Sequence, residues 1–158
     1  MNFAPEPVGA PLALPKPLEP FALYQPVRWN GNTLHISGQV AAVEGHFPLR
    51  GRVGAELTIE QGQQAARQCA LNVLALIDRE LDGFARVAAL VKVTVFVSSA
   101  VEFTDHHLVA DGASRVFIQA LSQAGEHARS ALGVARLPMD SPVEVEAAVL
   151  VRPLPRLA

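Results

Sequence analysis

The chain has 158 residues, of which 50% are hydrophobic and only 18% are charged; its mean hydropathy is +0.25 and its formal net charge is −2. This length suits one domain with one core, and so few charges indicate that part of the surface is buried by self-association. The near-neutral charge, without a run of Lys or Arg, argues against a nucleic-acid surface.

The sequence also argues against a membrane, an export signal and a metal site. Its apolar runs, such as 147–151, are far shorter than the roughly 20 residues of a membrane-spanning helix. The first ten residues contain Glu6 and two prolines where a signal peptide has basic residues and then an apolar segment. Cys69 is the only cysteine, and the histidines lack metal-ligand spacing. With no phosphate loop or dinucleotide motif either, we expect a cytoplasmic protein without metal or cofactor.

The N-terminal part is rich in proline. Seven of the twelve prolines lie within the first 26 residues, which predicts an extended arm over 1–20 and a single domain over 21–158. The arm shows no recognisable arrangement of functional groups.

Periodicity and turn residues then predict the elements of the domain. In chain order these are strands near 24–29 and 33–43, a loop over 44–57, a helix near 60–81, a strand over 86–99, a helix over 105–122, and two final strands in "RSALGVARL" and "SPVEVEAAVLV". Asn30-Gly31 indicates a hairpin between the first two strands, and Thr58 and Gln61 stand at capping-box spacing before the first helix. The "PMD" segment predicts a hairpin-like connection between the last two strands.

The strand over 86–99 should be central, because one of its faces is wholly apolar and the other mostly so. The wholly apolar face comprises Val87, Ala89, Val91, Val93, Val95 and Val97. The last strand places Glu144 and Glu146 on one face and valines on the other. The element order predicts an α+β fold in which two helices cover one face of a mixed sheet and self-association buries the other.

Several separated motifs resemble the Rid/YjgF family, the reactive intermediate deaminases. They are "YQPVRWNGNTLHISGQ", "VKVTVFV" and "ARSALGVARLPMDSPVEVEAAVLV", and the resemblance runs from about Tyr24 to Val151. It is closest to a branch with a longer loop before the first helix. The resemblance implies a chorismate-mutase-like fold, a homotrimer with three pockets between neighbouring subunits, and hydrolysis of enamines and imines to 2-keto acids and ammonia.

The resemblance also implies roles for two charged residues. Arg129 corresponds to the arginine that binds the substrate carboxylate, for which a planar guanidinium is well suited. Glu144 corresponds to the glutamate that positions water. From the residues alone, the favoured interpretation of Arg129 is a solvated residue at a strand start, and only the resemblance reverses this preference. Glu146 fits a rim or salt-bridge position better than catalysis.

Five further positions correspond to the family's pocket. Tyr24 matches an aromatic lining residue, although it also suits the closure of a sheet edge. Ser37 and Gly38 match an "SGQ" motif, in which the glycine admits either a ligand or a simple bulge. The chain departs from the family at Ala131, where a cysteine is usual, and at His107, where an asparagine is usual.

Three functions remain open on the sequence alone. The first is deamination of 2-imino acids by Arg129 and Glu144. The second is a trimer that binds a small carboxylate metabolite without turnover, for which Ala131 and His107 leave room. The third is RNA cleavage, which the net acidity disfavours.

Overall fold

The computed structural model describes residues 12–154. Its elements are β1 (Val27–Asn30), β2 (Thr33–Val40), α1 (Ile59–Leu81), β3 (Val87–Ser98), α2 (His106–Leu121), η1 (Ser122–Gly125), β4 (Ala128–Val134), η2 (Pro138–Asp140) and β5 (Val143–Val151). Among these residues, no helix is both long and apolar enough to cross a membrane.

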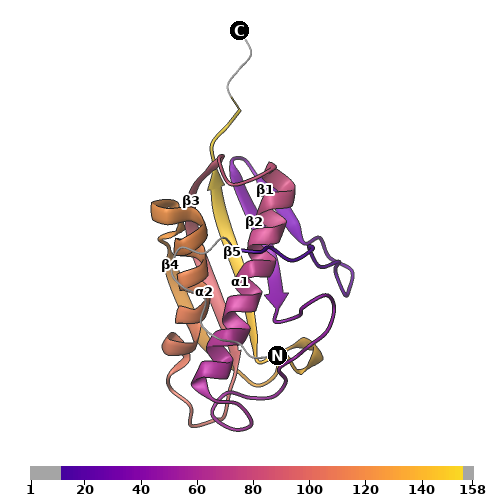
Figure 1. The fold of residues 1–158 in the computed structure, drawn as a ribbon, viewed down its shortest axis with the longest axis vertical. Coiled ribbons are helices and arrows are strands. Elements are labelled where there is room, and N and C mark those ends of the chain that lie inside the picture. The colour runs from indigo at the N-terminus through magenta and orange to yellow at the C-terminus, as the bar shows by residue number, and fades with distance from the viewer. Residues whose placement is uncertain (1–11, 155–158) are drawn as a thin grey trace.

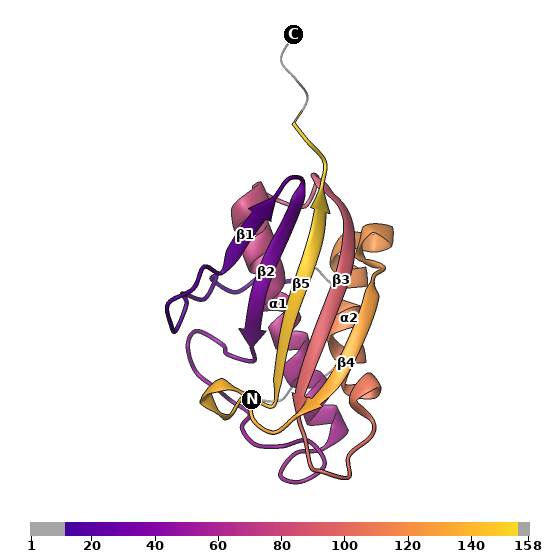
Figure 2. The same cartoon turned by 180° about the vertical axis from the view of Figure 1, so that it is seen from behind.

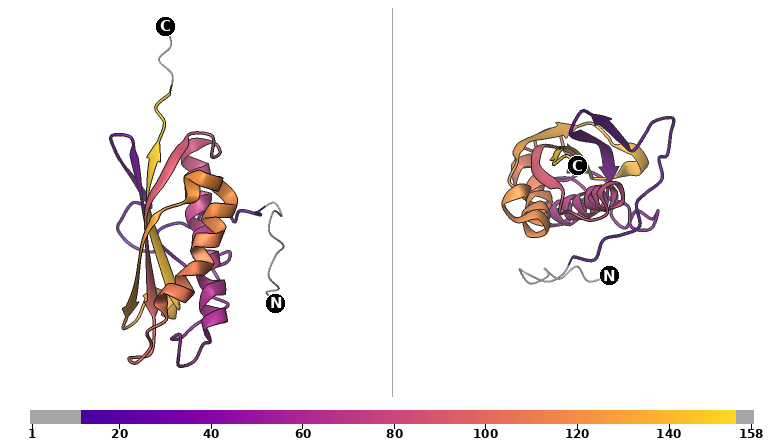
Figure 3. Two further views of the ribbon diagram at one scale, coloured as in Figure 1. Left: turned by 90° about the vertical axis from the view of Figure 1, so that its left-hand side faces the viewer. Right: turned by 90° about the horizontal axis from the view of Figure 1, so that it is seen from above.

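The elements form two layers, as predicted. A five-stranded sheet in the order β1-β2-β5-β3-β4 makes one layer, and α1 and α2 lie side by side on one of its faces (Figures 1 and 3). The core fills the space between the layers. Seen from behind, the strands face the viewer with no helix in front of them (Figure 2). We call this second surface the open face.

Helix α1 begins where the sequence predicts, because its start is encoded locally. Thr58 Oγ1 accepts a hydrogen bond from the backbone N–H of Gln61, and the Gln61 side chain accepts one from the backbone N–H of Thr58. The helix ends at Asp82, which takes a left-handed conformation. The predicted apolar stripe, including Cys69, lies in the core.

The predicted hairpin-like pairing of the last two strands is wrong. β3 lies between β4 and β5, pairing in parallel with β4 and antiparallel with β5. The connection from β4 to β5 crosses the end of β3, where the Ser98 N–H donates to the Pro142 carbonyl over 2.9 Å. A short connection between antiparallel strands usually joins neighbours, but here α2 has already brought β4 to the far side of β3.

Two other predictions need local corrections. The first hairpin has Gly31 and Asn32 as its loop residues. Its first strand, β1, begins at Val27, so Tyr24 precedes the strand rather than lying in it. In β3 the pairing with β5 shifts between Leu90 and Lys92. This β-bulge places Leu90 and Val91 on the faces opposite to those that the alternation predicts. Leu90 is therefore buried and Val91 is exposed.

The alternation predicted for the last strand is confirmed. In β5 the residues Val143, Val145 and Val149 are completely buried under the helices. Glu144 and Glu146 lie on the open face, together with Leu150. The two glutamates therefore belong to the surface that no helix covers.

Candidate functional site

A hollow of about 270 Å³ lies beside Glu144. One wall is the segment before β1, which contributes residues 18–22 and Tyr24. A second wall is η2, which contributes Pro138 and Met139. The structure therefore brings Tyr24, Gly38 and Glu144 together within one chain and adds a wall from the proline-rich segment.

The Glu144 carboxylate packs directly over Gly38. A Cβ atom at position 38 would overlap Oε1 of Glu144, so only glycine leaves room for the side chain in this position. Burial, and secondarily the charge of Glu146, raise the pKa of Glu144. A carboxylate with a raised pKa is a better proton acceptor once ionised.

Ser37 supports this hollow from outside rather than lining it. Its Oγ donates to the carbonyl of Gln25 over 2.8 Å, which ties the segment carrying Tyr24 to β2. Ser37 itself lines a separate hollow on the open face, together with Lys92 and Glu146. Glu146 is exposed there and does not line the Glu144 hollow.

The wall formed by η2 has an unusual backbone. Met139 and Asp140 are consecutive non-glycine residues with φ of 57° and 58°. Such left-handed residues persist only where their surroundings hold them, and they gather at functional sites. Here the Asp140 carbonyl accepts from the Gly51 N–H, and the Asp140 carboxylate pairs with Arg136.

Arg129 lies in a second, separate cluster between β4 and α2. Its Nη1 donates to Asp111 Oδ1 over 2.9 Å and to Ser114 Oγ over 2.8 Å, and its Nη2 donates to the His107 carbonyl over 3.1 Å. These three partners stand at i, i+4 and i+7 of α2, so one face of the helix holds the guanidinium.

His127 fixes the far side of this cluster. Its Nδ1 is 2.6 Å from the Gly125 carbonyl, which can only accept, so Nδ1 carries the proton. Nε2 therefore accepts from Ser114 Oγ at 3.0 Å. Burial chiefly, and the nearby Arg129 charge, lower the pKa of His127, which favours this neutral tautomer.

The other two predicted residues lie near Arg129. His107 contributes its backbone carbonyl, whereas its side chain is exposed. Ala131 lies two residues along β4 on the same face and packs against the core. The structure thus brings His107, Arg129 and Ala131 together.

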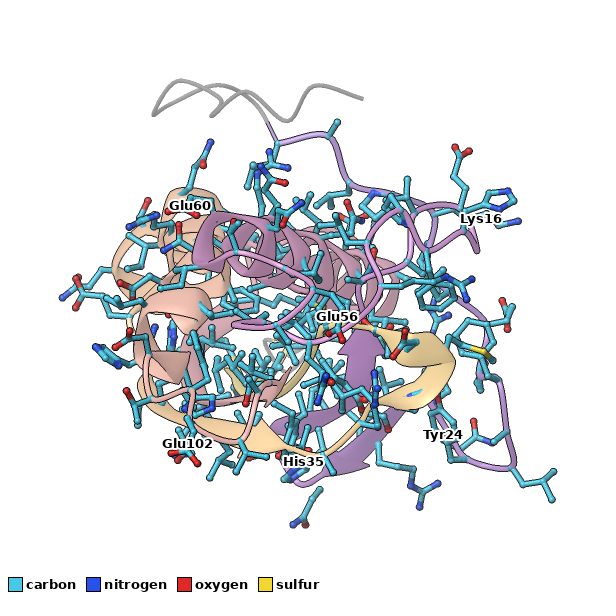
Figure 4. The ribbon with its side chains drawn as sticks, turned by 90° about the horizontal axis from the view of Figure 1, so that it is seen from below. Lys16, Tyr24, His35, Glu56, Glu60 and Glu102 are labelled. Atoms are coloured by element: carbon cyan, nitrogen blue, oxygen red, sulfur yellow. The ribbon has the colours of Figure 1, made fainter. Side chains whose placement is uncertain are left out.

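The two clusters lie on opposite sides of the molecule. Arg129 pairs across the sheet with Val93 and Ala147 on the helix-covered face, whereas Glu144 is on the open face and two strands away. Figure 4 shows Tyr24, which lines the Glu144 hollow, at one side of the molecule. Glu102, in the loop that leads into the helix holding Arg129, lies at the other side. One chain therefore does not bring Arg129 and Glu144 to the same ligand.

Comparison with known proteins places the chain in a family. A family model described as Endoribonuclease L-PSP matches residues 15–151. The chain belongs to this family, the Rid/YjgF family. Protein TCP17 of Trypanosoma cruzi is 40% identical to this chain over 87% of each chain. A 2-iminobutanoate/2-iminopropanoate deaminase of Dermatophagoides farinae is 30% identical over 91% of this chain and 94% of its own length.

Solved structures of the Rid/YjgF family share the fold. The protein Atu1372 of Agrobacterium tumefaciens, whose function is unknown, superposes with a TM-score of 0.83 at 36% identity, covering 89% of this chain and 86% of its own. The Escherichia coli protein TdcF with bound serine gives 0.59 at 26% identity, covering 87% and 92%. The chorismate-mutase-like fold expected from the sequence is thereby confirmed.

Sequence reasoning missed three contributors to these clusters. Asp111 and Ser114 are polar residues on a helix, and their pattern is the same as that of an ordinary solvated face. The wall from residues 18–22 lies partly within the arm to which no function was assigned. Only the contact between α2 and β4, which no local sequence pattern encodes, identifies Asp111 and Ser114 as members of the Arg129 cluster. Within residues 12–154, no group of three or more His, Cys, Asp or Glu is arranged to hold a metal ion.

Proposed function

We propose that this chain hydrolyses 2-imino acids to 2-oxo acids and ammonium at sites shared between subunits of a homotrimer. The observation that carries the proposal is the separation of Arg129 from Glu144. Each cluster holds half of the groups that the reaction needs, and they lie on opposite sides of one chain. A ring of three copies would place the Glu144 hollow of one beside Arg129 of the next.

The open face supports such an assembly. Leu132 and Leu150 are 45% and 41% exposed, and both lie on this face together with the half-buried Phe96. Burial of this apolar surface between copies would be favourable by roughly 25 cal/mol per Å². Closed rings form when each copy offers one surface to the next in the same way.

In the proposed reaction, Arg129 binds the substrate carboxylate and Glu144 accepts a proton from water. The water oxygen adds to the imine carbon, the C–N bond breaks, and nitrogen leaves as ammonium. The net reaction of the protonated form is C=NH₂⁺ + H₂O → C=O + NH₄⁺. The raised pKa of Glu144 suits proton acceptance from water, and Gly38 admits its side chain to the hollow.

The relatives add support of two kinds. The Dermatophagoides farinae relative is described as an imine deaminase, and the Escherichia coli structure holds serine, a small amino acid with a carboxylate. RNA cleavage, which the family description names, finds less support, because the net charge of −2 offers little attraction for phosphates.

The proposal is tested by generating 2-iminopropanoate in situ with an amino-acid oxidase acting on alanine and measuring pyruvate release with and without the protein. Glu144→Gln should lower the rate about 100-fold or more, because an amide keeps the shape but accepts protons poorly. Glu146→Gln, the matched control two residues away, should leave it within about twofold. Alanine or pyruvate binding without any acceleration by the wild-type protein would favour the non-catalytic trimer instead.

A further inference from the structure

Arg129 keeps two N–H donors that no described group of its own chain uses. A guanidinium has five such donors. Both of those on Nη1 and one on Nη2 are taken by Asp111, Ser114 and the His107 carbonyl. The Nε proton and the second Nη2 proton remain, and the side chain is 22% exposed. Two donors are what a carboxylate accepts in a bidentate contact.

Asp111 likewise keeps one charged atom free. Its Oδ1 accepts from Arg129, whereas Oδ2 has no partner among residues 12–154. At 39% exposure, this side chain is more accessible than the arginine it contacts. The pair therefore presents an unused negative oxygen beside the two unused positive donors.

The surrounding contacts hold both groups in place. Asp111 and Ser114 lie on the same face of α2, so both bind Nη1 from one side. Ser114 is fixed in turn by His127, whose ring packs edge-on against Phe117 with centroids 5.7 Å apart. Because these contacts fix the two charges relative to each other, the pair sets the distance that must separate the opposite charges of a ligand. A surface salt bridge between mobile side chains would set no such distance.

We infer that Arg129 and Asp111 together select zwitterionic ligands, with the carboxylate on Arg129 and the protonated nitrogen on Asp111 Oδ2. The inference rests on the proposed use of Arg129 as the carboxylate site. An amino acid, or an imino acid in its iminium form, offers a cation to Asp111. A 2-oxo acid offers only its anion and is repelled by Asp111. The same pair would thus retain the substrate and favour release of the product.

Calorimetry with alanine and pyruvate tests the inference, because these two ligands share a carbon skeleton. They differ only at carbon 2, which carries an amino group in alanine and an oxo group in pyruvate. Asp111→Asn is nearly isosteric and partly exposed, so it should leave the fold intact. In this variant, alanine should bind about tenfold or more weakly. Pyruvate should bind as well as before or more tightly, because the repulsion from the Asp111 carboxylate is gone and the Arg129 guanidinium no longer forms an ion pair with residue 111.

Ser114→Ala is the matched control, because it removes the other Nη1 partner but keeps the Asp111 carboxylate. It should change alanine and pyruvate affinity by the same factor. An equal loss of both ligands in Asp111→Asn would overturn the inference and leave Asp111 as a residue that only positions Arg129. No change for either ligand would also overturn it.

Failure here is distinguishable from failure of the proposed function. If Arg129→Ala leaves pyruvate affinity unchanged, the carboxylate site itself is misplaced and both proposals fall. If Arg129→Ala abolishes pyruvate binding while Asp111→Asn weakens both ligands alike, only the zwitterion inference falls. Imine turnover is a separate readout that depends on Glu144.

Discussion

At the scale of single residues, the surroundings of each carboxylate decide its chemistry. Glu144 and Glu146 are two residues apart on one strand and share a face. Only Glu144 packs into the space that Gly38 leaves, and burial there raises its pKa. Glu146 stays exposed beside Lys92 on the open face. The alternation predicts their shared face, but the difference between them depends on β2, which lies a hundred residues earlier in the chain.

The raised pKa of Glu144 predicts a pH-dependent stability. Because the folded state disfavours the ionised carboxylate, it loses stability relative to the unfolded state as pH rises from the ordinary value of about 4.3 through the raised value. Glu144→Gln removes this loss. Its melting temperature should therefore exceed that of wild type at pH 7 and match it near pH 3.5. Circular dichroism melts at both pH values measure this.

Glu102→Gln provides the matched control for these melts. Glu102 is exposed in the loop before α2, so its replacement should change the melting temperature little. A Glu144→Gln difference of the same size at both pH values would show that the amide acts through packing or hydrogen bonding and not through ionisation.

At the scale of elements, α1 and α2 approach closely where both carry glycine. A Cβ on Gly112 would overlap the backbone carbonyl of Gln63 in α1. A Cβ on Gly62 would come within 3.0 Å of Val53 and 3.1 Å of Val109. This crossing also sets the position of the α2 face that holds Arg129. Gly112 is therefore a structural residue with a consequence for the site.

Gly112→Ala should destabilise the protein even though alanine is the better helix former. The intrinsic gain is about 1 kcal/mol, but the overlap is with backbone, so the helices must separate at a larger cost, about 2–3 kcal/mol. The net effect should be a melting temperature lower by several degrees, with weaker pyruvate binding as α2 shifts. Arg115→Ala, at an exposed position of the same helix, should change the melting temperature little. A stabilised Gly112→Ala variant would contradict the close approach.

The elements also show how far sequence reasoning reaches. Helix α1 is predicted well because its cap and apolar stripe are local. The β4 position is predicted wrongly because its parallel pairing with β3 depends on the intervening α2, and the bulge at Leu90 breaks the period that the alternation assumes. For the site, family resemblance supplies Arg129 and Glu144. It does not supply Asp111 or Ser114, whose partners lie on another element.

At the scale of the whole molecule, one layer of helices leaves the sheet with two unlike faces. The covered face carries the core. The open face mixes apolar residues such as Leu132 and Leu150 with the charged residues Lys92 and Glu146. A sheet with this composition is incompletely buried in a single copy. The separation of the two site clusters across the molecule is consistent with the same assembly.

If three copies associate through the open face, a charge placed there should separate them without unfolding the chain. Leu150→Asp introduces a carboxylate on the surface that the assembly would bury, and an unpaired buried charge costs several kcal/mol. Sedimentation should show wild type as a trimer at micromolar concentration and Leu150→Asp as a monomer with an unchanged circular dichroism spectrum.

Ile118→Asp is the control, because Ile118 is 47% exposed on the opposite, helical side of the molecule. This variant should stay trimeric. The monomeric variant should also lose imine turnover, since it separates Arg129 from Glu144. A wild-type monomer, or a Leu150→Asp monomer with full activity, would rule out a site shared between subunits.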